Sequence, residues 1–372
     1  MYDQVFSFEG TLAKHASLAD TAPETASIHE LLATPYAIFN PLSDHQLEAL
    51  AQKSATITRQ RFGHVMRFFV PLYLSNECYN NCTYCGFSYG RDIQRYTLTD
   101  QDIVDNIDIL TKKGFQHVLL LTGEAAKTVE MPYFKRVLPL IRPRVAQLGM
   151  EVQPLDESDY RDLVALGLDS VTVYQETYHK DNYLIHHLSG KKRRFDYRLT
   201  TADRAANAGI FRINIGALLG LSDWRFEAIA LVDHLRYLTQ RYWKTQFSVS
   251  FPRITSIFDS TQRLFPVSDQ QLVHLVCAFR CLFPDLGITL STRESAKLRN
   301  GLMRLGITDM SAESLTSPGG YSGVEADAQF DTADHRSLVA IQAEVANQGL
   351  DAVVKDWDAH FSTPVMHSHS SS

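Results

Sequence analysis

The chain has 372 residues, of which 45% are hydrophobic and 21% charged, and its formal net charge at pH 7 is −6. This composition is that of an ordinary globular protein, and the length suits one large barrel with extensions or two smaller domains. The negative charge argues against a general nucleic-acid binder, no stretch approaches the roughly 18 apolar residues of a membrane helix, and the N-terminus lacks the pattern of a secretory signal.

The first 64 residues are predicted to form a helical N-terminal extension. Residues 28–32 and 44–50 carry apolar side chains at helical spacing, and Ser43 is placed as the N-cap of the second helix.

From residue 65 onward, short β-rich runs alternate with longer helical segments. The runs span residues 65–76, 117–124, 150–155, 170–177, 211–220, 246–253, 287–295 and 309–314. Several are continuously apolar in the middle, as parallel strands buried on both faces are. Eight such units predict a (β/α)8-type barrel over residues 65–315. Residues 316–372 are then a C-terminal segment that closes the barrel and ends in a disordered tail.

A doubly wound open sheet is the competing fold class, and the position of the polar residues separates the two. Polar side chains follow strand after strand, at Glu124, at Gln153, at Gln175 and Glu176, and at residues 291–294. Candidate functional residues at the ends of many strands are typical of a barrel mouth, whereas an open sheet concentrates them at one switch point.

Three of the five cysteines stand close together after the first predicted strand. Cys78, Cys82 and Cys85 have the spacing Cys-x3-Cys-x2-Cys. Three thiolates can hold three irons of a cubane iron–sulfur cluster and leave the fourth iron open, whereas electron-transfer clusters of this type use four cysteines. Because open coordination positions are where metal sites act on small molecules, the spacing predicts a catalytic cluster.

Other uses of these cysteines fit less well. A zinc site would need a second pair of ligands, and a disulfide would leave one cysteine over. Cys277 and Cys281 lie four residues apart in an apolar helical run, so we expect them in the core. Few cysteines and an oxygen-sensitive cluster favour the reducing cytoplasm.

The cysteine motif, with the aromatic Tyr84 before its last member, resembles the radical S-adenosylmethionine (SAM) superfamily. Other segments narrow the resemblance to the 2-iminoacetate synthases, the tyrosine lyases of bacterial thiazole biosynthesis. These segments are residues 71–76, 122–124, 153–155, 174–179, 250–253, 291–294, 318–321 and 355–358. The resemblance runs from about residue 58 to residue 358, nearly the whole chain.

The resemblance implies a [4Fe–4S] cluster on the three cysteines and SAM on its open iron. Glu124 would then bind the SAM ammonium, although a helix N-terminus could also explain this carboxylate. Arg198 would meet the SAM carboxylate, with a surface salt bridge as the alternative.

Further SAM contacts are expected from the aromatic and amide side chains near the strand ends. Tyr84, or alternatively Phe87, could pack on the adenine, with ordinary loop packing as the other interpretation. Gln153, Gln175 and Glu176 could hydrogen-bond the ribose.

For the amino-acid substrate, Arg293 at the end of the seventh strand is the expected partner of the carboxylate. An arginine can bind a carboxylate with two parallel hydrogen bonds, which a lysine cannot. The resemblance adds Tyr73 and Ser311 as its companions. The alternative for Arg293 is an ion pair with Glu294 or Glu313.

The activity implied by the resemblance is cleavage of the Cα–Cβ bond of L-tyrosine. The products would be 2-iminoacetate and p-cresol, with 5′-deoxyadenosine and methionine as co-products. The implied partners are thiazole synthase and a low-potential electron donor, a flavodoxin or a ferredoxin. Two alternatives stay open, a tryptophan lyase and a non-catalytic iron–sulfur binding module. A hydrogenase-maturation lyase is disfavoured because no cysteine follows Cys281 for a second cluster.

Overall fold

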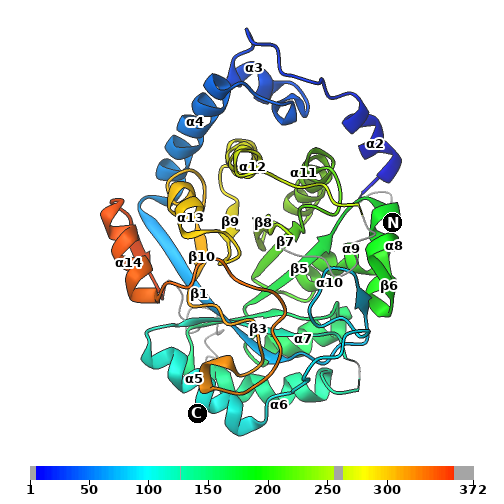
Figure 1. Ribbon diagram of the computed structural model, residues 1–372, viewed down its shortest axis with the longest axis vertical. Helices are drawn as coiled ribbons and strands as arrows, with labels where there is room; N and C mark the ends of the chain where they lie inside the picture. The colour runs from blue at the N-terminus through cyan, green and yellow to red at the C-terminus, as the bar shows by residue number, and fades with distance from the viewer. Residues whose placement is uncertain (1–5, 126, 255–262, 356–372) are drawn as a thin grey trace, which may run out of the picture.

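The computed structural model describes residues 6–125, 127–254 and 263–355 (Figure 1). Eight parallel strands form a closed barrel with helices around it. In chain order they are β1 (Val65–Ser75), β3 (His117–Thr122), β4 (Gln147–Glu151), β5 (Ser170–Glu176), β7 (Arg212–Ala217), β8 (Gln246–Ser250), β9 (Gly287–Leu290) and β10 (Asp309–Ser311). The last strand pairs in parallel with the first, so the sheet has no open edge between them. The predicted (β/α)8-type barrel is confirmed.

The predicted position of the third strand is wrong by three residues. The run expected at 150–155 is β4, which spans Gln147–Glu151. Gln147 and Gly149 are poor strand formers by propensity, which hid the beginning of the strand. Gly149 is required by packing, because a Cβ there would lie 2.5 Å from Ser170 Oγ on the neighbouring strand β5.

The helices between the strands cover the outside of the barrel. They are α5 (Asp100–Lys112), α6 (Met131–Ile141), α7 (Glu157–Ala165), α8 (Lys180–His186), α9 (Phe195–Leu199), α10 (Thr201–Asn207), α11 (Trp224–Arg241), α12 (Asp269–Leu282) and α13 (Ala296–Leu302). Capping boxes begin α5 at Thr99 and α12 at Ser268. Cys277 is fully buried in α12, in the core where the sequence placed it.

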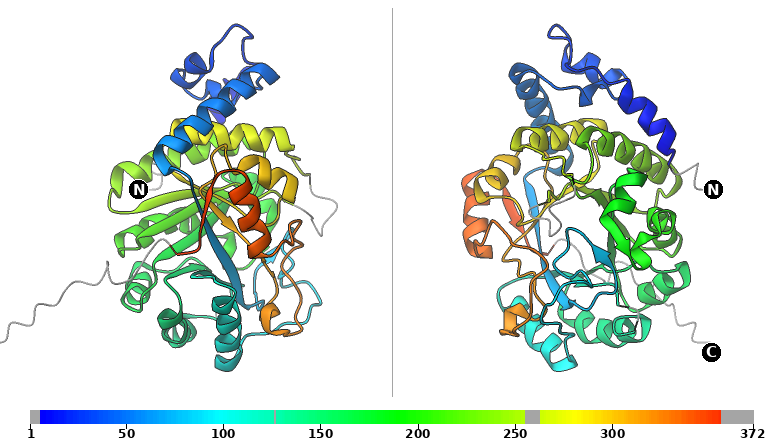
Figure 2. Two further views of the ribbon diagram at one scale, coloured as in Figure 1. Left: turned by 90° about the vertical axis from the view of Figure 1, so that its left-hand side faces the viewer. Right: turned by 45° about the vertical axis from the view of Figure 1, so that its right-hand side comes forward.

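The N-terminal helices reach along one side of the barrel (Figures 1 and 2). They are α2 (Phe8–Ala16), α3 (Ile28–Ala33) and α4 (Asp44–Phe62). The helix α4 packs on α12, and α2 packs on α11. Ser43 caps α4 in a capping box, as the sequence predicts. Lys14 of α2 forms an ion pair with Asp233 of α11, with 2.6 Å between Nζ and Oδ2.

The chain after β10 passes back over the barrel before it ends in α14 (Leu338–Asn347) and β11 (Asp351–Val353), which adds to β1 from outside the ring. An ion pair between Arg299 of α13 and Asp334 holds this segment, and both side chains are fully buried. The predicted disordered tail lies outside the described residues. In the part of the chain that the structure describes, no helix has the length and apolar character to span a membrane.

Candidate active site

The loop that carries the three cysteines follows β1 and is fixed by hydrogen bonds at its ends. Asn76 accepts from the backbone N–H of Tyr96 at 2.7 Å and donates to the carbonyl of Gln94 at 2.8 Å. Within the loop, the N–H of Cys82 donates to Ser88 Oγ at 2.9 Å. A loop bound in this way holds its thiols in one arrangement.

The cysteine loop contributes one strand of a short two-stranded sheet. The strand β2 (Asn81–Cys82) pairs antiparallel with β6 (His187–Ser189). Gly190, directly after β6, has a φ of 93°, and a Cβ there would lie 2.1 Å from Asn80 Oδ1. The glycine therefore lets the segment after α8 lie directly on the cysteine loop.

The three thiols fit a cluster-binding role. Cys78 and Cys82 are buried, Cys85 is half-buried, and all three are free. Burial raises the pKa of Cys78 to about 11, with the nearby Cys85 adding to the shift. Burial also raises the pKa of Cys82, against the lowering effect of Lys192. Buried thiols of this kind ionise when a metal supplies the compensating positive charge.

The three thiols are also the donor set of a cubane cluster with one open iron. Cys78, Cys82 and Cys85 stand on one loop, and the other two cysteines lie in α12. Clusters that only transfer electrons use four cysteine ligands. The residues present therefore fit a [4Fe–4S] cluster that leaves one iron open.

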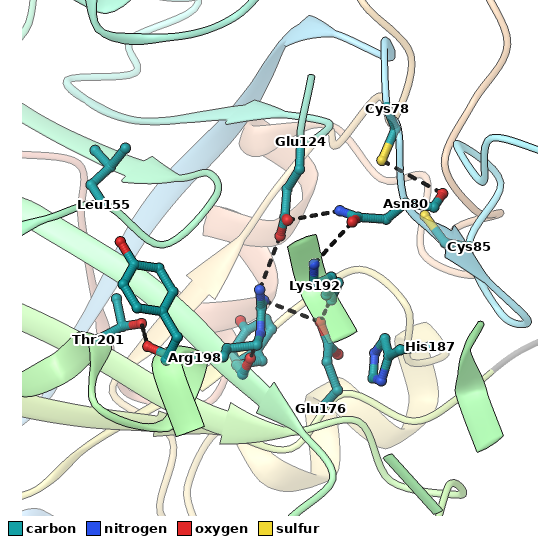
Figure 3. A network of polar contacts seen from close by, with 12 residues as sticks. Cys78, Asn80, Cys85, Glu124, Leu155, Glu176, His187, Lys192, Arg198 and Thr201 are labelled. Carbon is teal, nitrogen blue, oxygen red and sulfur yellow. Dashed lines mark hydrogen bonds and ion pairs between the residues drawn. The ribbon is translucent and has the colours of Figure 1, made fainter. Parts of the chain in front are cut away.

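Beside the cysteine loop, a network of buried charges joins the ends of β3 and β5 (Figure 3). Glu124 accepts from Asn80 Nδ2 at 2.7 Å and from Arg198 Nη1 at 3.0 Å. Arg198 also lies 3.4 Å from Glu176 Oε1, which Lys192 approaches to 2.7 Å. Burial opposes the ionisation of Glu176, yet Lys192 and Arg198 hold its pKa below the ordinary value. The four charged groups thus compensate one another.

Glu124 and Arg198 line a cavity that also contains Gln153. The Gln153 amide donates to the carbonyl of Val129 at 2.8 Å, while its buried Oε1 has no partner. Gln175 lies elsewhere, because strand alternation turns its side chain outward, where it donates to the carbonyl of Phe195 at 3.4 Å. The structure brings Gln153 to the cavity and does not bring Gln175 there.

A second cavity occupies the mouth of the barrel. It is lined by Tyr73, Tyr84, Cys85, Arg293 and Ser311, among others. Five of the predicted binding residues, Glu176 among them, therefore meet here next to a cluster cysteine.

Arg293 makes no ion pair with any residue that the structure describes. The two expected alternatives have other partners, since Glu294 binds Arg253 and Glu313 binds Lys113. The Arg293 guanidinium lies 3.3 Å from the centroid of the Phe330 ring. Burial lowers the pKa of Arg293, although Tyr73 nearby counteracts this shift. A half-buried cation without an anion has lost part of its hydration without compensation, so the site is suited to an anionic ligand.

Comparisons with known proteins agree with this geometry. Residues 72–232 match the Radical SAM superfamily, and residues 250–351 match the Biotin and Thiamin Synthesis associated domain. The 2-iminoacetate synthase of Escherichia coli (strain K12) is 47% identical over 326 residues, which cover 87% of this chain and 86% of that protein. The chain belongs to the 2-iminoacetate synthase family of radical SAM proteins.

Other members of the superfamily are similar as well. The 2-iminoacetate synthase of Salmonella typhimurium is 46% identical over 87% of this chain and 86% of its own length. The crystal structure of HydG, a maturase of the [FeFe]-hydrogenase, superposes with a TM-score of 0.87 at 26% identity and covers 95% of this chain and 81% of that one. Radical SAM proteins bind a [4Fe–4S] cluster and SAM, and this family member binds both.

The sequence did not identify three residues that face this site. Glu151 was missed because the end of β4 was placed four residues too late. Lys192 belongs to the basic run of residues 191–194, and its ammonium is turned inward to Glu176. Gln329 lies on the segment after β10, far from the cysteines in the sequence. A correct end of β4 would have revealed Glu151; nothing local in the sequence marks Gln329.

Gln329 connects the substrate cavity with the cysteine loop. Its Oε1 accepts from the Tyr73 hydroxyl at 2.8 Å, and its Nε2 donates to Cys85 Sγ at 3.7 Å. Its backbone carbonyl accepts from the N–H of Gly86 at 3.0 Å. A Cβ on Gly86 would lie 2.4 Å from that carbonyl oxygen. The segment after β10 therefore packs directly on the cysteine motif.

Replacing Cys82 by serine should prevent cluster assembly, because a hydroxyl does not supply the thiolate that iron requires. Iron content and 5′-deoxyadenosine formation after anaerobic reconstitution measure the effect, and both should fall to background. The matched control is Cys281→Ser, in α12 and away from the loop, which should keep both. A Cys82→Ser variant that retains iron and activity would contradict the assignment of the three cysteines.

Proposed function

We propose that this protein is a radical SAM lyase that cleaves the Cα–Cβ bond of L-tyrosine. The products are 2-iminoacetate and p-cresol, with 5′-deoxyadenosine and methionine as co-products. The observation that carries the proposal is the half-buried Arg293, which has no ion-pair partner among the described residues and lines the same cavity as Cys85. The identity of 47% with a 2-iminoacetate synthase supports the reaction.

The substrate carboxylate binds the guanidinium of Arg293 through two hydrogen bonds. Ser311 Oγ accepts from the backbone N–H of Thr292 at 3.1 Å, so its own hydroxyl proton is free to be donated to the same carboxylate. Tyr73 lines the same cavity and can donate its hydroxyl once it releases Gln329. Together these groups select an amino acid by its carboxylate.

The substrate ammonium binds Glu151. In the ring of strands, β4 and β9 are four steps apart, so Glu151 faces Arg293 across the barrel. Glu151 forms no ion pair or hydrogen bond among the described residues, whereas the other carboxylates at the mouth are paired. A zwitterion between the two groups supplies each of them with a counter-charge.

SAM lies between the cysteine loop and the charged network. Bound to the cluster, SAM would supply the radical that starts the reaction, and the residues around it would hold it in place. Glu124 has lone pairs left for the SAM ammonium beside its bonds to Asn80 and Arg198. Arg198 uses three of its five N–H groups on Tyr174, Glu124 and Glu176, which leaves two for the SAM carboxylate. Tyr84 and Gln153 face the adenosine.

Two partner proteins follow from this chemistry. Because 2-iminoacetate is an imine that water hydrolyses, direct transfer to thiazole synthase avoids its loss. The cluster also needs one electron per turnover from a low-potential donor such as a flavodoxin or ferredoxin. The five free cysteines are consistent with the reducing conditions of the cytoplasm, where we place the protein.

Anaerobic turnover of the reconstituted protein tests the reaction. With SAM and a reductant, tyrosine should give p-cresol and 5′-deoxyadenosine. Tryptophan should give no cleavage product and much less 5′-deoxyadenosine. Mass spectrometry measures the products of both reactions. Deoxyadenosine without p-cresol would reject tyrosine as the substrate. A cluster-loaded protein that forms neither product would instead be a binding module.

Replacing Arg293 by alanine should raise the KM for tyrosine by about 100-fold or more, because two charge-assisted hydrogen bonds are lost. SAM binding should stay close to the wild-type value, since Arg293 lies outside the charged network. Arg304→Ala, at an exposed arginine, is the control. If SAM affinity fell as much as tyrosine affinity, the role given to Arg293 would be wrong.

The affinity for tyrosine should depend on the ionisation of Glu151. Burial, with the nearby Glu176, raises the pKa of Glu151 to about 7. The carboxylate that binds the ammonium is therefore present above this pH and is lost by protonation as the pH falls below it. The KM for tyrosine should rise as the pH falls through roughly 7. In Glu151→Gln the KM should be high throughout and nearly independent of pH.

A further inference from the structure

An exposed apolar patch lies on the outer side of the cysteine loop. We call it the cluster-side patch and define it as Tyr79, Tyr89, Leu184, Ile185 and Leu188, which are 38%, 63%, 41%, 45% and 46% exposed. These five make up half of the ten large hydrophobic side chains that are most exposed among the described residues. Such a concentration on one face marks an interaction site more often than chance exposure.

The residues of the patch lie on two neighbouring segments, the cysteine loop and the α8–β6 segment. The rings of Tyr79 and Tyr89 meet edge to face with 6.2 Å between centroids. The N–H of Tyr89 donates to the carbonyl of Asn80 at 2.8 Å, and the same loop pairs with β6 through Asn81 and Ser189. Leu188 lies on β6. Leu184 and Ile185 lie in the last turn of α8, which leads directly into β6. Figure 1 shows α8 and β6 together at the edge of the molecule.

The patch has a basic rim in an acidic protein. Between residues 180 and 194 the chain has five lysines and arginines and one acidic residue, although its net charge is −6. Lys192 turns inward, and Lys191 and Arg194, although exposed, line the cavity that contains Gln153; Arg193 is the exposed basic side chain that contacts the patch segment. Arg193 donates to the carbonyl of His187 at 2.8 Å, which ties the rim to β6. An acidic partner is repelled by most of this surface and attracted here.

The patch also lies close to the cluster ligands. Cys82 is part of β2, and its Cα pairs with that of His187 on β6, the strand that carries Leu188. Tyr79 directly follows Cys78 in the chain. A protein bound here comes near the cluster without entering the substrate cavity, which begins at Cys85.

We propose that the cluster-side patch is the docking surface of an acidic electron-transfer protein that reduces the cluster. One electron passes from the reduced carrier to the cluster, so the carrier is oxidised by one electron and no proton or group is transferred. Brief contacts of redox proteins use small surfaces with charged rims, and this patch has that form. The inference rests on the proposed radical chemistry, but not on tyrosine as the substrate.

The test compares two reductants on the reconstituted full-length protein. The probes are a reduced, acidic bacterial flavodoxin and photoreduced 5-deazariboflavin, a small uncharged reductant. The readout is the rate of cluster bleaching in stopped flow, which requires no amino-acid substrate. The variant is Ile185→Glu with Leu188→Glu, and its matched control is Leu12→Glu with Val339→Glu, which adds the same charges at exposed apolar positions on α2 and α14.

The patch variant should slow reduction by flavodoxin about tenfold or more and leave reduction by deazariboflavin unchanged. The control variant should behave as the wild type with both reductants. Equal rates of the patch variant and the wild type with flavodoxin would overturn the proposal, and so would equal slowing with both reductants, because that result indicates damage to the cluster loop.

A measurement on the unaltered protein adds an independent criterion. The rate with flavodoxin should fall as ionic strength rises, while the rate with deazariboflavin stays constant. A rate with flavodoxin that is independent of salt would overturn the electrostatic docking. The wild type could also be a dimer and the patch variant a monomer that flavodoxin reduces at the wild-type rate. In that case the patch joins two copies of the chain, and the proposal is wrong. Failure of p-cresol formation would leave this test unaffected.

Discussion

The guanidinium of Arg198 is the interaction on which the mouth of the barrel depends. It donates to the carbonyl of Tyr174 at 2.6 Å and compensates two buried carboxylates, Glu124 and Glu176. Glu124 in turn accepts from Asn80, which lies between the first two cluster cysteines (Figure 3). Without Arg198 two buried negative charges would lose a partner, and the cost of about 3–5 kcal/mol that such losses carry would fall on the element that holds the cluster. The cluster loop and the SAM cavity therefore share one electrostatic support.

The substrate cavity follows the opposite rule. Arg293 and Glu151 are half-buried with no ion-pair partner among the described residues, although unpaired charges withdrawn from water lower the stability of a folded protein. Proteins keep such groups where a ligand completes them. The pair faces each other across the barrel, so the ligand that compensates both carries two opposite charges, as an amino acid does. The contrast between a closed charge network and an open charge pair separates the cofactor side of the mouth from the substrate side.

The sequence was sufficient for the barrel, because short β-rich runs alternate with helical segments eight times and several of these runs are continuously apolar in the middle. It also located Arg293, since a residue just after a strand must lie at the mouth. The beginning of β4 was missed because Gly149 is selected by its contact with Ser170 on another strand. The predicted run was shifted toward the C-terminus, so Glu151 was not recognised as the last residue of the strand. Gln329 is placed at Cys85 by the path of the chain after β10, and no local pattern of residues encodes such a long-range contact. The roles of the binding residues stay predictions.

The two sides of the cysteine loop have different surroundings, and this division follows from the chemistry. Cys85 borders the cavity and receives a hydrogen bond from Gln329, whereas Cys82 lies on the strand that pairs with β6 beneath the exposed apolar patch. A radical in the cavity must be kept from water and from other reductants, while an electron carrier must come close to the cluster from outside. The loop has only eight residues from Cys78 to Cys85. It can meet both demands if its cysteines face opposite sides. In the proposed scheme, the Cys-x3-Cys-x2-Cys loop thus separates the side of electron entry from the side of bond cleavage.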